Sequence, residues 1–349
     1  MNNRGEVIVI IGCDVDPDRN PEGVKISSGE EIWDGVTKGI SELKEMFSSF
    51  VSNDNPYPNI TWLLRADEQM NKLYNDYAYP VRYFKGMWQS FHKDGDEIGW
   101  HPHLWDWSDE HEWWYPRLDD NKWTNTCLDN GYNAITKHFK ITSVRTGWDF
   151  QSNFIMKKLN ALGIIVDFSA LPMQKVIAFE SAPPPYRYDW RITTEEFYHP
   201  STVDYRRKAK VGEKALKILE MPLSLTPITF TRAISKFLYH NYKHFSNKKL
   251  AGPLVSYSFH RKEIMRIAKD PLLFKPGVES KFKECKAENC TKYIITYFHP
   301  DELLRNDLFS IKNFGNNLKY ISNMSKKYDV PYRFLTATDA ANECLRKHH

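Results

Sequence analysis

The chain of 349 residues contains no apolar run near the roughly 20 residues that a membrane-spanning helix requires. Its first apolar stretch, Val7 to Ile11, is too short for the hydrophobic region of a secretion signal and better suits a buried strand. Cysteines are few and odd in number, five in all, which argues against a disulfide-stabilised secreted fold. We therefore expect a globular, cytoplasmic protein without a transmembrane segment.

A strong charge of one sign is also missing. The formal net charge is only +4, and no block of lysine and arginine resembles a nucleic-acid-binding surface. Aromatic residues are instead abundant, and six of the 11 tryptophans fall between Trp88 and Trp114. Indole rings offer flat apolar faces with a hydrogen-bonding edge, which suits stacking on sugar rings. These features disfavour nucleic acid as a partner and favour a carbohydrate, with a tryptophan-rich loop that packs on itself as the alternative.

Apolar runs and helical periodicity alternate along the chain, as is typical of βα units. The first predicted strand, Val7 to Cys13, is followed by a helix that begins at a capping box of Ser28 and Glu31 and continues through Phe47. Seven or eight strands in this order predict an α/β fold, a distorted (β/α) barrel with its reactive groups at the carboxyl ends of the strands. The further strands are expected near 60–64, 96–105, 141–145, 164–168, 217–221, 293–298 and 332–335.

No repeat, low-complexity segment or linker divides the sequence, so we expect a single domain over residues 1–349 with insertions. One insertion, at about 104–127, is rich in aromatic residues. The second, at about 224–283, contains an amphipathic basic helix near 230–245, which either packs on the core or lies on a membrane surface. No feature of the sequence indicates an oligomeric state.

The stretch from Asp96 to Trp105 carries two histidines separated by one proline, His101 and His103. In an extended strand, side chains two positions apart point the same way, so both imidazoles can reach one metal ion. The alternative is a pair of surface histidines on a loop.

Other predicted strands also end in titratable or charged residues: Asp14 and Asp16, Arg145, Asp167, and His299. Barrel geometry brings such ends to one pocket, which supplies two imidazoles and a carboxylate for a divalent ion, with another carboxylate and imidazole for proton transfer. That is the equipment of a metal-assisted hydrolase. Each residue also has a structural alternative: the aspartates as loop or helix-cap residues with Asp18 as a ligand, Arg145 as a bridge between strands, Asp167 as a cap, and His299 as a core histidine.

The ordered set of motifs resembles the polysaccharide deacetylase superfamily, the carbohydrate esterases with NodB homology. The motifs are Asp14-Val15-Asp16, Glu97-Ile98-Gly99-Trp100-His101, Arg145-Thr146-Gly147-Trp148, Asp167-Phe168-Ser169 and Phe298-His299-Pro300. The resemblance implies a distorted barrel of seven strands and hydrolysis of an N-acetyl or similar amide on a sugar. It also implies that Asp16, His101 and His103 hold the metal, that Asp14 is the general base, and that His299 is the general acid.

The same resemblance implies two supporting roles. Arg145 pairs with Asp14 and favours its ionised form, and Asp167 accepts a hydrogen bond from one nitrogen of His299 and raises its pKa. Substrate contacts are expected from Trp100, Trp105, Trp148, Tyr186 and Arg187. Zinc is the expected metal, with cobalt, nickel, iron or manganese as other occupants of such a site.

The sequence departs from the common family pattern at two places. Val15 separates aspartates that are usually adjacent, so either Asp14 or Asp16 can be the ligand and the other the base. The histidines are spaced His-x-His rather than His-x-x-x-His, a spacing found in divergent branches linked to bacterial surface polysaccharides such as O-antigen. Two rival functions follow: a degenerate barrel that binds glycan or metal without turnover, and an amidohydrolase-type metal hydrolase.

Overall fold

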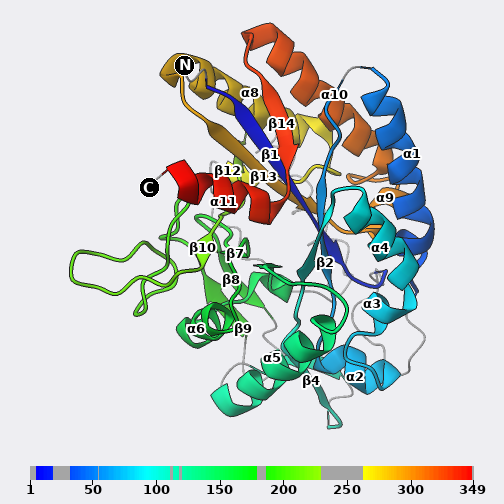
Figure 1. The fold of residues 1–349 in the computed structure, drawn as a ribbon, viewed down its shortest axis with the longest axis vertical. Helices are drawn as coiled ribbons and strands as arrows, with labels where there is room; N and C mark the ends of the chain where they lie inside the picture. Colours follow the sequence, from blue (N-terminus) through cyan, green and yellow to red (C-terminus); the bar gives the residue numbers. More distant parts are fainter. Residues whose placement is uncertain are drawn as a thin grey trace, which may run out of the picture.

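The fold is described from a computed structural model for residues 5–18, 32–53, 55–110, 113–117, 120–178, 186–228 and 262–347 (Figure 1). Its main sheet has eight strands, all paired in parallel, in the order β10-β7-β6-β3-β2-β1-β13, with β14 also paired with β1. The predicted distorted (β/α) barrel is confirmed. The strands are β1 (Val7–Val15), β2 (Ile60–Leu64), β3 (Glu97–Trp100), β6 (Ser143–Val144), β7 (Val166–Asp167), β10 (Leu219–Glu220), β13 (Lys292–Phe298) and β14 (Tyr332–Leu335).

Strand β1 is the centre of this sheet, and every one of its residues is buried. One edge pairs with β13, while the other pairs first with β14 and then with β2. A continuous apolar run is what a parallel strand covered on both faces requires. The segment that follows β10 connects the β10 and β13 edges of the sheet. The backbone N–H of Leu223 donates to the Ala170 carbonyl, and that of Ser224 donates to the Ile295 carbonyl.

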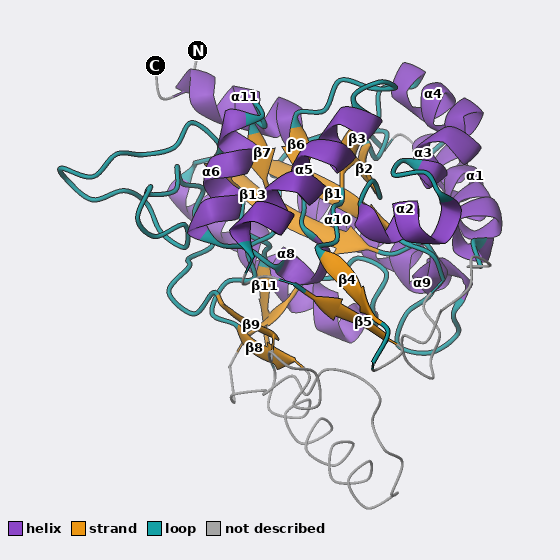
Figure 2. Ribbon diagram, turned by 90° about the horizontal axis from the view of Figure 1, so that it is seen from below, coloured by secondary structure: helices purple, strands orange, loops and turns teal. Residues whose placement is uncertain are grey.

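Helices cover the outside of the curved sheet (Figures 1 and 2). Helix α1 buries Leu43 and Phe47, and α10 buries Phe314 and Leu318, which gives each an apolar face toward the strands. The helices are a π-helix (Gly35–Gly39), α1 (Ile40–Val51), α2 (Glu68–Tyr74), α3 (Tyr79–Tyr83), α4 (Lys85–Lys93), α5 (Asn121–Ile135), α6 (Asn153–Ala161), α8 (Pro271–Glu288), α9 (Asp301–Leu304), α10 (Ile311–Tyr328) and α11 (Ala337–Lys347).

Helix α11 closes the amino-terminal end of the sheet. Its Ala337 N–H donates to the Thr61 hydroxyl at the start of β2, and its Thr338 N–H donates to the carboxylate of Glu97 at the start of β3. The hydroxyl of Thr336 accepts the Asp339 N–H and takes the capping position of this helix. The opposite, carboxyl-terminal end is thereby left as the end that can hold a site.

Short paired strands lie in both of the segments predicted as insertions. The aromatic segment contains a hairpin of β4 (Trp105–Ser108) and β5 (Trp113–Pro116), and α5 starts at Asn121, where Asp120 caps it through the Trp123 N–H. In the second, β11 (Leu225–Pro227) pairs with β12 (Lys262–Ile264), and α8 already belongs to the outer helices, where it packs on α10 and β13. Figure 2 shows a further hairpin, β8 (Lys175–Ala178) with β9 (Tyr186–Asp189), on the same side of the sheet as β4 and β5.

Two sequence predictions lie outside the described residues: the capping box of Ser28 and Glu31, and the amphipathic helix near 230–245. Among the helices that the structure describes, none combines the length and apolar character needed to cross a membrane. Helix α6 is capped by Ser152, whose hydroxyl accepts the Ile155 N–H, and Gly163, with φ +83°, follows its end.

Candidate metal centre and active site

The carboxyl end of β1 delivers two aspartates to the interior of the sheet. Side chains alternate along a strand, so Gly12, Asp14 and Asp16 share one side. Gly12 has no side chain for a specific reason: a Cβ there would lie 2.6 Å from Cε2 of Phe168, whose ring occupies the space below the aspartates. Both aspartates are buried, with Asp14 1% and Asp16 9% exposed.

His101 and His103 follow the end of β3, and the backbone pairing continues through them. The His101 N–H donates to Leu64 of β2, and the Gly147 N–H donates to Pro102. Strand β3 itself ends at Trp100, earlier than expected, yet this extended segment keeps the alternation of a strand. The two imidazoles therefore point the same way, and their Nε2 atoms lie 3.1 Å apart, as the sequence spacing predicts.

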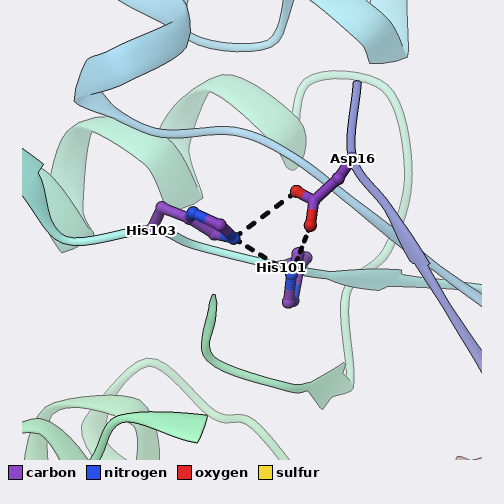
Figure 3. A group of neighbouring side chains, drawn as sticks. All are labelled: Asp16, His101 and His103. Atoms are coloured by element: carbon purple, nitrogen blue, oxygen red, sulfur yellow. Dashed lines mark hydrogen bonds and ion pairs between the residues drawn. The ribbon is translucent and has the colours of Figure 1, made fainter. Parts of the chain in front are cut away.

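Asp16, His101 and His103 form a buried group that could hold a metal ion (Figure 3). Besides the contact between the two imidazoles, Asp16 Oδ2 lies 3.7 Å from Nε2 of His101 and Asp16 Oδ1 lies 3.4 Å from Nε2 of His103. Tetrahedral zinc with bonds of about 2.1 Å separates its ligands by roughly 3.4 Å. The three separations bracket that value, so the donor set fits a divalent ion in both chemistry and spacing.

The hydrogen bonds of His101 define its tautomer. Its Nδ1 lies 2.6 Å from the carbonyl oxygen of Arg145, which can only accept, so Nδ1 carries the hydrogen and Nε2 presents a lone pair to the group. In a metal-binding histidine, the ring nitrogen that does not bind the metal commonly donates its hydrogen to a carbonyl in this way. A buried oxygen nearby, Oδ1 of Asp14, lies 4.0 Å from Nδ1 of His101 and accepts no hydrogen bond from the described part of the chain.

The electrostatics of the group favour a positive charge. Burial alone would raise the pKa of Asp16, but His103, His101 and Arg65 lower it well below its usual range. Burial alone would lower the pKa of His101, but Asp14 and Asp16 raise it. Burial and the guanidinium of Arg65 lower the pKa of His103 well below its usual range, so this imidazole is neutral, the form that binds metals.

Arg145, at the end of β6, pairs with Asp14 as predicted. Its Nη1 donates to Asp14 Oδ2 and its Nη2 donates to the carboxylate of Asp149, and the guanidinium is 2% exposed. Burial raises the pKa of Asp149 to about 6, while Arg145 opposes the shift. One buried arginine thus holds two carboxylates, of which the sequence prediction included only Asp14.

Gly147, in the predicted Arg-Thr-Gly-Trp motif, packs directly against the His103 ring. A Cβ at this position would lie 1.9 Å from Cδ2 and 2.2 Å from Nε2 of His103. The next two residues, Trp148 and Asp149, adopt left-handed backbone angles, with φ of 59° and 55°. Such angles are rare outside glycine and concentrate at functional sites.

His299 follows β13 on the same side as Tyr297 and faces both aspartates. Its Nε2 lies 3.7 Å from Asp14 Oδ2 and 3.7 Å from Asp16 Oδ2. Its Nδ1 lies 3.0 Å from Nη2 of Arg266 and 3.5 Å from Oε1 of Glu302. Five of the residues predicted for the metal and the proton transfers therefore meet at one point: Asp14, Asp16, His101, His103 and His299.

Asp167 occupies a different cluster from the one expected. Its carboxylate accepts hydrogen bonds from Gln151 at 2.7 Å and from the Ser169 N–H at 3.0 Å, and burial raises its pKa. The predicted pairing of Asp167 with His299 is wrong: the carboxylate beside His299 Nδ1 belongs to Glu302. Asp167 instead lies next to Glu220, whose pKa is raised well above its usual range by burial and by Asp167.

The predicted substrate-contact residues divide into three groups. Trp100 is fully buried and donates its Nε1–H to the Ala66 carbonyl, which makes it a core residue and contradicts the prediction. Trp105 and Trp148 lie beside the metal group. The ring centroids of His103 and Trp105 are 6.0 Å apart, and those of Trp105 and Trp148 are 5.3 Å apart. The backbone of Tyr186 and Arg187 belongs to β9, while their side chains are outside the described part.

Sequence reasoning missed the support that β2 provides. Arg65 donates to Asp16 at 3.0 Å and to Asp67 at 2.5 Å, and Asp67 accepts the backbone N–H of His103 at 3.1 Å. The signal was present, because Arg65 and Asp67 follow a strand as directly as Asp14 and Asp16 do. Arg266 and Glu302 gave no comparable signal, since only the folded chain brings Arg266 to His299.

Comparison with known proteins gives a likeness in fold alone. No family model matches the sequence, and no curated protein matches it. A solved structure described as a glycoside hydrolase/deacetylase candidate from Parabacteroides distasonis superposes with a TM-score of 0.54 and 11% identity, over 100% of this chain and 73% of that one. A polysaccharide deacetylase candidate from Mycobacterium smegmatis gives 0.49 and 11%, over 99% and 92%. The first of these likenesses supports the predicted fold, a distorted (β/α) barrel, and shows nothing finer.

Proposed function

We propose that this protein is a metal-dependent hydrolase that removes an N-acetyl or similar acyl group from a sugar or glycan intermediate. The observation that supports the proposal most is the meeting of Asp16, His101 and His103 beside Asp14 and His299 at one end of the barrel. The likeness to a glycoside hydrolase/deacetylase candidate supports the same reaction class. The tryptophans beside His103 suit a sugar ring.

The chain supplies a base for the attacking water and a hydrogen donor for the departing amine. Asp14, oriented by Arg145, accepts the proton of the attacking water. His299, across from it, donates to the amine as the C–N bond breaks. No serine or cysteine nucleophile is needed. A divalent ion, when bound by Asp16, His101 and His103, polarises the amide carbonyl and stabilises the developing negative charge by several kcal/mol.

Zinc is the proposed metal because two imidazoles and a carboxylate are a donor set that it favours, although cobalt, nickel, iron or manganese also bind such ligands. A place in surface polysaccharide assembly and a cytoplasmic location complete the proposal. The first is suggested by the His-x-His spacing, and the second by the five cysteines, all of them free, which suit a reducing compartment.

Two measurements on one preparation test the function. We expect protein purified without chelator to contain about one divalent ion per chain and to release acetate from N-acetylated sugars. Metal without acetate release, across a panel of N-acyl sugars, would support a barrel that binds without turnover. Release of ammonia or amines from non-sugar amides alone would support an amidohydrolase-type enzyme. Absence of both metal and acetate would overturn the proposal.

A further inference from the structure

The outward side of His299 is held by a cation rather than by the expected carboxylate. Nη2 of Arg266 lies 3.0 Å from Nδ1 of His299. A guanidinium stays protonated and has only donors, so the nitrogen that it faces must accept. The hydrogen of a neutral imidazole then has one remaining place, Nε2, which is the nitrogen directed toward Asp14 and Asp16.

We propose that Arg266 is a positioning residue that fixes the ring and the tautomer of His299, so that Nε2–H is always presented to the reacting amide. His299 then works as a neutral hydrogen-bond donor to the departing nitrogen or to the carbonyl oxygen, and the proton that the amine gains is the one that Asp14 took from the attacking water. A neutral histidine used as a donor is known enzyme chemistry. The part of this inference that concerns the reaction rests on the proposed function, whereas the tautomer does not.

Arg266 itself is firmly held. It pairs with Glu302, which is fully buried, and its guanidinium lies 4.4 Å from the ring centroid of Tyr297 and 4.7 Å from that of Phe309. Its backbone forms a parallel bridge with Tyr297 of β13. An arginine stacked on two rings and paired with a buried carboxylate has little rotational freedom, which is what a positioning role requires.

The two histidines on either side of Asp16 show opposite arrangements. Nδ1 of His101 faces a carbonyl, an acceptor, so its Nε2 is bare and suited to bind a metal. Nδ1 of His299 faces a guanidinium, a donor, so its Nε2 carries hydrogen and is not suited to bind one. The group that faces Nδ1 therefore decides whether each histidine is suited to be a metal ligand or a hydrogen donor, although both rings face Asp16.

Glu302 makes the proposal sensitive to substitution. Its Oε1 lies 3.5 Å from Nδ1 of His299, close enough to accept a hydrogen from that nitrogen if Arg266 no longer donates to it. We expect Arg266→Met to reverse the tautomer, so that Nδ1–H faces Glu302. Arg266→Lys keeps a charged donor and should retain much of the original tautomer.

Nuclear magnetic resonance of the imidazole nitrogens in ¹⁵N-histidine-labelled protein tests this directly, with His299 assigned by His299→Gln. We expect a protonated Nε2 and an unprotonated Nδ1 in the parent chain, the reverse or an even mixture in Arg266→Met, and recovery in Arg266→Lys. The matched control is Arg305→Met, because Arg305 also lies over Phe309, at 5.3 Å, but pairs with Asp307. It should leave the signals unchanged.

The outcomes separate this inference from the proposed function, because the spectra need no substrate. A protonated Nδ1 in the parent chain, or unchanged nitrogens in a folded Arg266→Met, would overturn the inference whatever the activity. The expected spectra together with no acetate release would sustain the tautomer and overturn the function. In an active enzyme, Arg266→Met should lower kcat about tenfold or more with little change in KM, since a misdirected donor acts on the transition state.

Discussion

Two pairs of buried carboxylates lie at strand ends of the same sheet, and their surroundings are opposite. Asp14 and Asp16 face imidazoles and guanidiniums, which hold the pKa of Asp16 well below its usual range against the effect of burial. Asp167 and Glu220 face each other with the amide of Gln151 and the hydroxyl of Ser169, and burial raises both pKa values. The first pair is arranged for a cation, and the second for a shared proton.

The difference shows what distinguishes a metal-binding carboxylate from a structural one in this barrel. Both pairs are buried and both lie at the carboxyl ends of strands, and Asp167 belongs to the same predicted family pattern as Asp14 and Asp16. Burial costs a carboxylate several kcal/mol unless it is paired or protonated. The charge that faces it, rather than its place on a strand, therefore decides its role.

The largest difference between the pairs should appear on removal of a metal ligand. His101→Ala should lose the bound ion and lower kcat/KM about a thousandfold or more, because several kcal/mol of transition-state stabilisation disappear with the ion. Elemental analysis and acetate release measure both effects. The matched control from the other pair is Asp167→Asn, which should keep the ion. Equal metal contents in the two variants would contradict the assignment.

A smaller effect is expected where the first pair is altered without touching a ligand of the ion. Asp14→Asn should retain the metal and lower kcat by about 10² to 10⁴, since an amide cannot accept the proton of water. The same two assays apply. Loss of metal in this variant would instead make Asp14 the ligand, the alternative that the spacing Asp14-Val15-Asp16 leaves open.

The packing of His103 on Gly147 can be tested separately. Gly147→Ala places a Cβ within 2.2 Å of Nε2 and should weaken metal binding about 10- to 100-fold by displacing the ring. Titration with zinc, followed by calorimetry, measures the change. Gly86→Ala, on α4, is the control and should bind zinc as the parent chain does, because its added Cβ would meet no described atom beyond its own helix within 4 Å. An unchanged affinity in Gly147→Ala would show that this contact is not needed.

The second pair should reveal itself in the pH dependence of stability. The pKa of Glu220 is raised above its ordinary value of 4.5 in the folded chain, so protonation of this group favours the native state. Its contribution to the free energy of unfolding is therefore full below about pH 4.5 and is lost as the pH rises through the folded pKa. The loss is about 1.4 kcal/mol per pH unit at most. Glu220→Gln should flatten this slope in urea unfolding between pH 5 and 9. A parallel slope in both chains would contradict the shared proton.

Sequence reasoning reached the convergence of Asp14, Asp16, Arg145 and the histidines because it depends only on parallel strands ending together. It also contained the information needed to exclude Trp100 as a substrate contact. In an extended segment, neighbours point to opposite sides, so a residue next to His101 must point away from the metal group. The structure places Trp100 in the core accordingly.

Other parts of the site depend on contacts that no local pattern encodes. Arg266 precedes His299 by 33 residues, and it reaches that ring only because its backbone pairs with β13. The carboxylate near His299 is that of Glu302 rather than the predicted Asp167, and this likewise follows from how β7 and β13 are placed around the interior of the barrel. The left-handed angles of Trp148 and Asp149 are set by the surrounding packing rather than by residue type.

Arg145 serves the site with two chemically independent parts. Its carbonyl oxygen, which no substitution of the side chain removes, sets the tautomer of His101, while its guanidinium orients Asp14. A substitution of this side chain can therefore alter the proton-accepting half of the site while the carbonyl that orients His101 stays in place. Protein engineers could change the orientation of Asp14 through that side chain and keep the hydrogen bond to His101 Nδ1.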